Sequence, residues 1–161
     1  QFKFDYDQER VKLASLFPFV YPGAPCIYYG DEIGMDGGKD PDCRRAFLWD
    51  ESKWDHKLRD WFKKLIRVRN ERVSLRRGNY QQIAVSEEGY AFCRSQDEEH
   101  TFVVINFSDS ETHLHLPCDI ITLNEVHSMR DLLTGENFDY DREIAMTIPA
   151  LSARILALNE G

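Results

Sequence analysis

The stretch Tyr21–Asp50 constrains the fold of this chain most, because it joins a short apolar run to a long polar segment. The apolar run, Pro25–Tyr29, follows a Pro-Gly breaker and ends at Gly30, which is the pattern of a short buried strand. Beyond Gly30 no helical or strand periodicity returns before about Trp54. Loops of this length inside a compact domain are uncommon and usually functional. The stretch therefore predicts a buried strand that delivers a long functional loop.

Helical periodicity flanks this stretch on both sides. Asp7–Val20 predicts one helix and Asp55–Val73 a second, each with an aspartate as N-cap and apolar residues recurring at helical spacing. The predicted apolar faces consist of Val11, Leu13, Ala14, Leu16, Phe17 and Val20, and of Leu58, Trp61, Phe62, Leu65, Ile66 and Arg69. A single strand between two helices cannot satisfy its own backbone hydrogen bonds. We therefore expect the rest of its sheet to lie outside this chain, which looks cut from something longer.

From Asn79 onward the sequence consists of short runs separated by turn residues, which favours an antiparallel sandwich. The expected strands are Tyr80–Val85, Tyr90–Ser95, Thr101–Asn106, Thr112–Leu116, Ile144–Ile148 and Ala153–Leu158, with an irregular stretch over 117–141. The predicted domains are 1–77 and 78–161.

Composition excludes several classes of protein. The net charge of -8 argues against nucleic acid, because the chain has no excess of cations to displace phosphate counterions. The basic residues of Lys57–Arg77 are interleaved with acidic ones and predict a solvated helix face rather than a binding patch. No apolar run approaches 18 residues, so we expect no membrane span. The four cysteines form no C-x-x-C pair, which favours reduced thiols and a cytoplasmic location, with secretion of the parent protein left open.

The spacing Asp40-Pro41-Asp42-Cys43-Arg44 is the most informative in the loop. With Asp40 as a cap and Pro41 at the first helical position, Asp40 and Arg44 would lie one turn apart on the same side. A carboxylate beside a planar guanidinium can form hydrogen bonds with sugar hydroxyls, which both donate and accept. The alternative is a local salt bridge that only fixes the loop, and the spacing alone favours that alternative.

Other acidic and histidine residues carry weaker signals. Asp31 and Glu32 follow the expected strand, but neighbours in sequence tend to point apart, so we do not expect them to be a catalytic acid and base. Asp36, with Asp40 and Asp42, does not match a calcium loop, and Asx-turns are the better interpretation. His113 and His115 would share a strand face without a third ligand. The sequence thus indicates no metal or cofactor, and calcium elsewhere in the parent protein stays open.

The segment YPGAPCIYYGDEIGMDGGKDPDCRRAFLWDE resembles the region around the eighth barrel strand of the α-amylase family, glycoside hydrolase family 13. It is most similar to the branch of neopullulanases, cyclomaltodextrinases and maltogenic amylases, although Phe47 and Leu48 replace a methionine and a proline common there. The phrases Val103–Phe107, Asp131–Gly135 and Pro149–Ala153 are typical of the C-terminal sandwich of that branch.

The resemblance implies an α+β fragment, with the last strand and flanking helices of a (β/α)8 TIM barrel followed by an antiparallel β-sandwich. Asp7–Val20 would be the seventh barrel helix and Asp55–Val73 the eighth. The family hydrolyses α-glucosidic bonds with retention, using three acids that follow the fourth, fifth and seventh barrel strands. We expect none of them here, and the motif carrying the third to stand shortly before Gln1.

For the site, the resemblance implies that Asp40 and Arg44 hold the substrate on the nonreducing side of the cleaved bond. The implied partners are an α-glucan oligosaccharide and the N-terminal remainder of the parent enzyme, with self-association left open. A non-catalytic sandwich that binds carbohydrate or protein is the main alternative. A fragment whose open barrel faces drive self-association is another.

Overall fold

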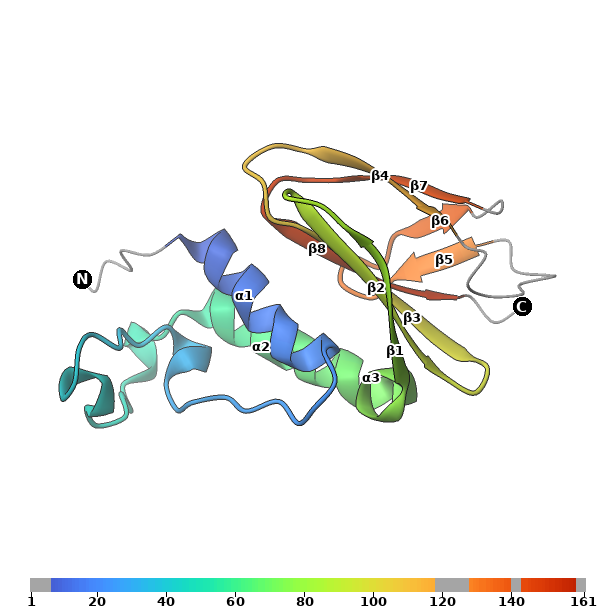
Figure 1. The fold of residues 1–161 in the computed structure, drawn as a ribbon. Coiled ribbons are helices and arrows are strands. Elements are labelled where there is room, and N and C mark those ends of the chain that lie inside the picture. Colours follow the sequence, from blue (N-terminus) through green and yellow to red (C-terminus); the bar gives the residue numbers. More distant parts are fainter. Residues whose placement is uncertain (1–6, 118–127, 140–142, 159–161) are drawn as a thin grey trace.

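A computed structural model describes residues 7–117, 128–139 and 143–158. The chain begins with helices and ends with strands (Figure 1). The last helix ends at Arg77 and the first strand begins at Asn79. The division into domains at 77 and 78 stays a prediction, because the two parts also share side-chain packing.

Both predicted long helices form, and their caps are the predicted ones. Helix α1 spans Gln8–Val20, and Asp7 accepts hydrogen bonds from the backbone N–H groups of its first turn. Helix α2 spans His56–Glu71, and the carboxylate of Asp55 accepts from the backbone of its first turn at 2.9 Å. A short helix, α3, covers Val73–Arg77. The capping aspartates therefore mark both helix starts in the sequence.

The buried faces of α1 and α2 lie against each other and against the sheet, and four residues differ from the predicted faces. Ala14 and Ile66 are exposed, whereas Phe19 and Val68 are buried. Phe19 meets Phe62 of α2 edge-on, with ring centroids 6.1 Å apart. The burial pattern is rotated slightly because α1 packs on both α2 and the strands, so its apolar stripe is set by two neighbours.

The expected strand Pro25–Tyr29 is not buried and forms no strand in the structure. Cys26, Tyr28 and Tyr29 are exposed. A strand exists only through its hydrogen bonds to neighbouring strands, and no strand of the described ranges pairs with this segment. Its expected partners are barrel strands outside this chain, so the burial of this run as a barrel strand stays a prediction.

Three short 3-10 helices interrupt the loop that we expected to be irregular up to Trp54. They are η1 (Asp31–Ile33), η2 (Asp42–Arg44) and η3 (Glu51–Lys53). Each spans only three residues, which is too short for any periodicity to be visible in the sequence.

In the ranges that the structure describes, eight strands form two antiparallel sheets. The strands are β1 (Asn79–Val85), β2 (Gly89–Gln96), β3 (Glu99–Asn106), β4 (Thr112–Pro117), β5 (Ser128–Asp131), β6 (Asn137–Asp139), β7 (Glu143–Ile148) and β8 (Ser152–Leu158). The larger sheet has the order β1-β2-β3-β8-β5-β6, and β4 pairs with β7 in the smaller one. Strands β5 and β6 lie in the stretch that we expected to be irregular. All six predicted strands are present within a few residues.

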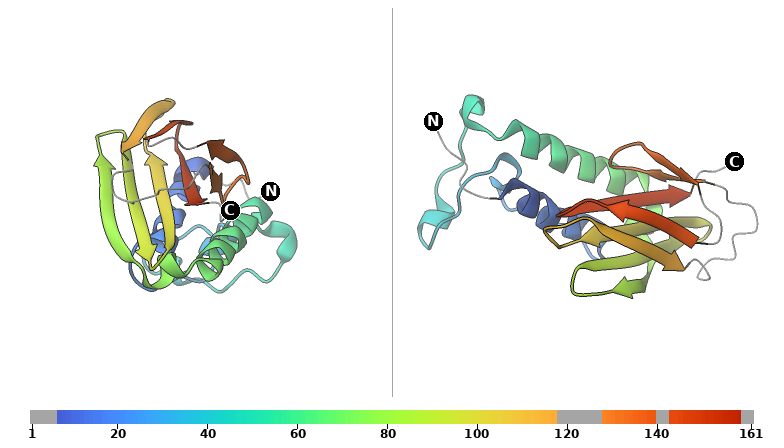
Figure 2. Two further views of the ribbon diagram at one scale, coloured as in Figure 1. Left: turned by 90° about the vertical axis from the view of Figure 1, so that its right-hand side faces the viewer. Right: turned by 90° about the horizontal axis from the view of Figure 1, so that it is seen from above.

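The larger sheet separates two cores, because successive side chains of a strand point to opposite faces. One face packs on the helices and the other on β4 and β7, so the molecule has three layers (Figure 2). On the helix side the buried sheet residues are Phe92, Val103, Ile105 and Ile155. On the other side they are Ala91, Cys93, Phe102, Val104 and Leu156, packed with Met129, Met146 and Ile148. The predicted combination of barrel-type helices with an antiparallel sandwich is confirmed.

Asn106, the first residue of a formal glycosylation sequon, lies buried at the end of β3. Its amide nitrogen donates to the carbonyls of Ser110 and Ile148 and lies 3.0 Å from that of Pro149. Its carbonyl oxygen accepts from the backbone N–H of Ser108 at 2.9 Å. The side chain is therefore a structural connector between β3 and the loops around β4 and β7.

Among the residues described, no helix combines the length and apolar character needed to cross a bilayer.

Candidate functional site

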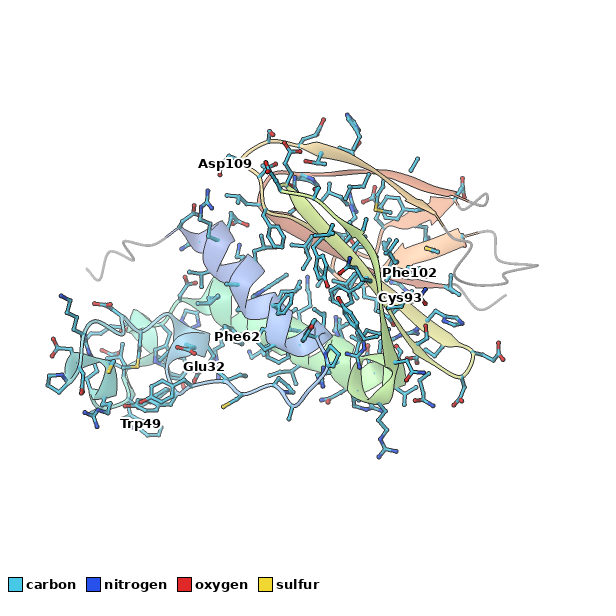
Figure 3. All side chains as sticks on the ribbon, viewed as in Figure 1. Glu32, Trp49, Phe62, Cys93, Phe102 and Asp109 are labelled. Carbon is cyan, nitrogen blue, oxygen red and sulfur yellow. The ribbon has the colours of Figure 1, made fainter. Side chains whose placement is uncertain are left out.

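The segment between α1 and α2 extends away from the two sheets and forms the far end of the molecule (Figures 1 and 2). It contains the predicted substrate-binding residues. Figure 3 shows Trp49 at the outer edge of this segment, well away from Phe62 in the helix core. Trp49 is 82% exposed, so the loop presents an aromatic ring to solvent.

Asp40 and Arg44 contact each other at the tip of this loop. Nε of Arg44 donates to Oδ1 of Asp40 at 3.0 Å, and Nη2 donates to the same oxygen. The two side chains are 66% and 65% exposed. The expected proximity of the pair is confirmed, but Asp40 is not a helix cap: η2 begins at Asp42, and no side chain caps it.

The pair leaves polar groups open to a ligand. Within the described ranges, no hydrogen bond occupies Oδ2 of Asp40 or Nη1 of Arg44. An exposed ion pair of this kind contributes only about 0–1 kcal/mol to stability. The arrangement can accept from one hydroxyl of a sugar and donate to another without breaking the ion pair.

Two tyrosines support the loop beside this pair. The rings of Tyr28 and Tyr29 lie 4.7 Å apart, and the Tyr29 hydroxyl donates to the carbonyl of Arg45 at 2.9 Å. The interaction with Tyr29 raises the pKa of the Tyr28 hydroxyl, and the positive charge of Arg44 opposes that shift. The segment that precedes η1 is therefore in contact with the segment around η2, and the loop folds back on itself.

The carboxylates that follow the expected strand have local roles. Glu32 accepts from the backbone N–H of Gly30 at 2.8 Å, which fixes the turn into η1. Partial burial raises the pKa of Asp31, while a backbone hydrogen bond from Tyr28 and the charge of Glu32 act in opposite directions on it. The exclusion of Asp31 and Glu32 as the catalytic pair stays a prediction, and Glu32 has a structural function.

Two buried arginines hold the start of the loop, and the sequence did not reveal this role. Arg69 of α2 donates to the carbonyl of Phe19 at 2.7 Å and also to that of Gly23. Arg94 of β2 donates at 2.9 Å to the carbonyls of Val20 and Gly78. Burial lowers the pKa of both guanidinium groups.

The sequence positions of both arginines hint at burial but do not prove it. Arg69 falls on the apolar face of its helix and Arg94 inside an apolar strand, and a cation at such a position must find acceptors when it is buried. Arg69 therefore does not belong to the solvated basic face that the charge pattern predicted. The C-terminal end of a helix offers free carbonyls to cations, and α1 supplies two of them here.

No cluster of three metal-ligating side chains occurs in the part of the chain that the structure describes. Asp36 accepts from the backbone N–H of Gly38 at 3.2 Å, which is the expected Asx-turn. His113 contacts the hydroxyl of Thr147 at 2.9 Å. The side chain of His115 and all of Cys118 lie outside the described residues.

Comparison with known families divides the chain into two matched regions. Residues 2–75 match the family described as "Alpha amylase, catalytic domain". Residues 81–157 match the family described as "Cyclo-malto-dextrinase C-terminal domain".

Individual relatives are named for the same branch. The chain is 36% identical to a cyclomaltodextrinase of Geobacillus thermopakistaniensis over 146 residues, which cover 89% of this chain and 24% of that protein. It is 43% identical to neopullulanase 2 of Thermoactinomyces vulgaris over 102 residues, which cover 62% of this chain and 17% of that protein. The chain thus spans a quarter or less of the length of these relatives.

Solved structures agree with the fold. The α-amylase of Geobacillus thermoleovorans, crystallised with acarbose, superimposes with a TM-score of 0.84 and 31% identity, and the match covers 94% of this chain and 33% of that one. The same likeness therefore extends over the helices, the loop and both sheets. The chain belongs to the α-amylase family of glycoside hydrolases, as part of the catalytic domain followed by a C-terminal domain of the cyclomaltodextrinase type.

Proposed function

We propose that the full-length protein hydrolyses α-glucosidic bonds with retention, in substrates such as maltooligosaccharides, starch, pullulan or cyclodextrins. The names of the relatives, cyclomaltodextrinase and neopullulanase, support this substrate class. The catalytic acids come from residues outside this chain, and the chain alone is inactive. Its contribution is one wall of the sugar cleft and the sheets that support it.

The observation that carries this proposal is the exposed pair of Asp40 and Arg44. The ion pair fixes both side chains relative to each other before any ligand arrives. Preorganisation of this kind lowers the entropy lost when a sugar binds. A sugar hydroxyl donates to Oδ2 of Asp40, and a neighbouring oxygen accepts from Nη1 of Arg44.

Binding by this pair contributes to catalysis by positioning the glucan chain. Sugar units held by the loop fix the glucan chain, so the scissile bond sits at the catalytic acids in other parts of the enzyme. Long substrates that reach the pair gain this energy, and short substrates do not. Discrimination by chain length is therefore the expected signature of the site.

The test compares Asp40→Ala and Arg44→Ala in the full-length enzyme on maltohexaose and on maltotriose. A hydrogen bond to a charged group contributes about 1.5–3 kcal/mol, so we expect kcat/KM for maltohexaose to fall about tenfold to a hundredfold. The loss on maltotriose should be smaller. Asp60→Ala is the matched control, because Asp60 forms a similar exposed ion pair with Lys63 on α2.

Unchanged kcat/KM in both variants, with only a small loss of stability, would identify the pair as a local salt bridge. Retention of the isolated chain on an amylose column would favour the alternative of a non-catalytic binding module.

We also propose a cytoplasmic location, supported by the free thiols of Cys26, Cys43 and Cys93. Recovery of the protein from the culture medium instead of the cell extract would refute this. Self-association stays a prediction, and the mass of the protein in solution decides it.

A further inference from the structure

A cavity of about 320 Å³ opens between α2 and the turn that joins β5 to β6. Its lining residues are Lys64, Arg67, Val68 and Glu71 of α2, and residues 130–135 of the opposite side. Lys64 spans the two sides, because its ammonium group donates to the carbonyl of Leu133 at 2.9 Å. The cavity therefore lies where a barrel-type helix meets the sandwich.

Positive charge predominates in this cavity. Lys64, Arg67 and Arg130 contribute three cations from two separate segments of the chain. Nε of Arg67 lies 4.0 Å from Glu71, which is the longest of the ion pairs found in the described residues. Arg130 forms no ion pair with any other side chain that the structure describes. The charge of these groups is therefore only partly compensated within the protein.

The other acidic group in the lining, Asp131, is fully engaged. It is buried, and Oδ1 accepts from the backbone N–H of Leu133 at 2.9 Å. Oδ2 accepts from the Thr134 hydroxyl at 3.0 Å and from Arg154 at 3.2 Å. Arg154 also pairs with Glu136 at 2.8 Å, so it is shared between two carboxylates, and the lining sets three cations against the two acidic groups Glu71 and Asp131.

This accumulation of cations stands out in a chain of net charge -8. Like charges placed around one hollow repel each other, and an anion inside the hollow removes that repulsion. Arginine also offers a planar set of N–H donors that matches the oxygens of a phosphate or carboxylate. The volume lies at the low end of the range for small-molecule sites, about 300–1,000 Å³, so the occupant is small.

We propose that this cavity binds a small phosphate-type oxyanion, carried by inorganic phosphate or by a monosaccharide phosphate, through Arg67, Arg130 and Lys64. The proposal does not depend on the proposed hydrolase activity. Such a ligand would connect α2 to the turn between β5 and β6, and so would link the barrel part to the sandwich.

Isothermal titration calorimetry on the full-length protein, in a buffer free of phosphate and sulfate, tests the proposal. The probes are inorganic phosphate, glucose 1-phosphate and, as the neutral comparison, glucose. We expect both phosphates to bind with one site per chain, and glucose not to bind at this site. Equal affinity for the two phosphates assigns recognition to the phosphate group alone, and tighter binding of glucose 1-phosphate shows that the sugar is also contacted.

Charge variants locate the site. We expect Arg67→Gln and Arg130→Gln each to weaken phosphate binding at least tenfold, and Glu71→Gln to strengthen it. Lys63→Gln is the matched control, because Lys63 lies next to Lys64 on the same helix, pairs with Asp60 and does not line the cavity. Thermal unfolding without phosphate shows whether each variant is folded.

Three results would overturn the proposal. These are absence of phosphate binding, an equal loss of affinity in Lys63→Gln and Arg67→Gln, and displacement of bound phosphate by glucose. The first two would reduce the cations around the cavity to an ordinary solvated surface, and the third would assign the binding to a sugar instead of a phosphate. None of them affects the proposed glucan hydrolysis.

Discussion

The guanidinium of Arg94, on a strand of the larger sheet, donates to the carbonyl of Val20 in the last turn of α1 at 2.9 Å. The same group donates to the carbonyl of Gly78, directly before the first strand. One buried side chain of the sandwich therefore binds the C-terminal end of α1, where the loop that carries Asp40 and Arg44 begins. Arg69 does the same from α2, through Phe19 and Gly23.

Replacing Arg94 by Met should destabilise the protein by about 2–4 kcal/mol, because buried carbonyls then lose their donor. Arg77→Gln serves as the control, because Arg77 is exposed and its replacement removes the same charge. Chemical denaturation of both variants measures the difference. Similar unfolding free energies for the two variants would show that water replaces Arg94 without cost.

Gly30 occupies a backbone conformation that other residues avoid. Its φ angle is 96°, and a Cβ atom there would lie 2.7 Å from the sulfur of Met35. We expect Gly30→Ala to lower the unfolding free energy by about 1–3 kcal/mol. Gly37→Ala is the comparison, because nothing lies within 4 Å of its Cβ position. Equal stability of the two variants would show that the backbone at Gly30 and the side chain of Met35 adjust to a Cβ atom without cost.

Glu99 should make stability depend on pH in the acidic range. Burial alone would raise its pKa, but hydrogen bonds from Ser74 and the charge of Arg72 outweigh burial, so the pKa is lower than the ordinary value of 4.5. The unfolded chain then binds a proton at a higher pH than the folded chain does. The stabilisation is present above about pH 4.5 and is lost as pH falls through the folded-state pKa.

Glu99→Gln should therefore flatten the loss of stability below about pH 4.5, measured by urea unfolding at several pH values. Glu98→Gln controls for net charge, because Glu98 is exposed. Burial lowers the pKa of His100, which also destabilises the fold as pH falls below its ordinary value of 6.5. The charges of Glu98 and Glu99 both oppose that shift, so either substitution changes the His100 contribution in the same direction. A parallel change in both would contradict the special role of Glu99.

Much of the fold was readable from local sequence patterns. Asp7 and Asp55 marked the helix starts because capping depends only on neighbouring residues. Short runs bounded by turn residues identified the long strands β2, β3 and β8. Strands β5 and β6 were missed because segments of four and three residues carry no alternation that can be distinguished from a loop.

Features that depend on distant partners were less accessible. The segment Pro25–Tyr29 has the composition of a buried strand, but pairing decides whether a strand forms. The contact between Asp40 and Arg44 followed from a spacing of four residues, whereas the assignment of Asp40 as a cap failed because the helical turn begins two residues later. The cavity beside Arg67 and Arg130 joins positions far apart in sequence, and no local pattern could reveal it.

The helix-side core contains residues of α1, α2, α3 and the larger sheet in a single cluster. Leu16, Phe62 and Phe92 lose their packing together if the strands separate from the helices. We therefore expect the helices and the strands to unfold in one cooperative transition, although their sequence patterns differ sharply. If the chain were cut between Arg77 and Asn79, each half would expose the apolar surface that the other half covers. We expect each half alone to aggregate.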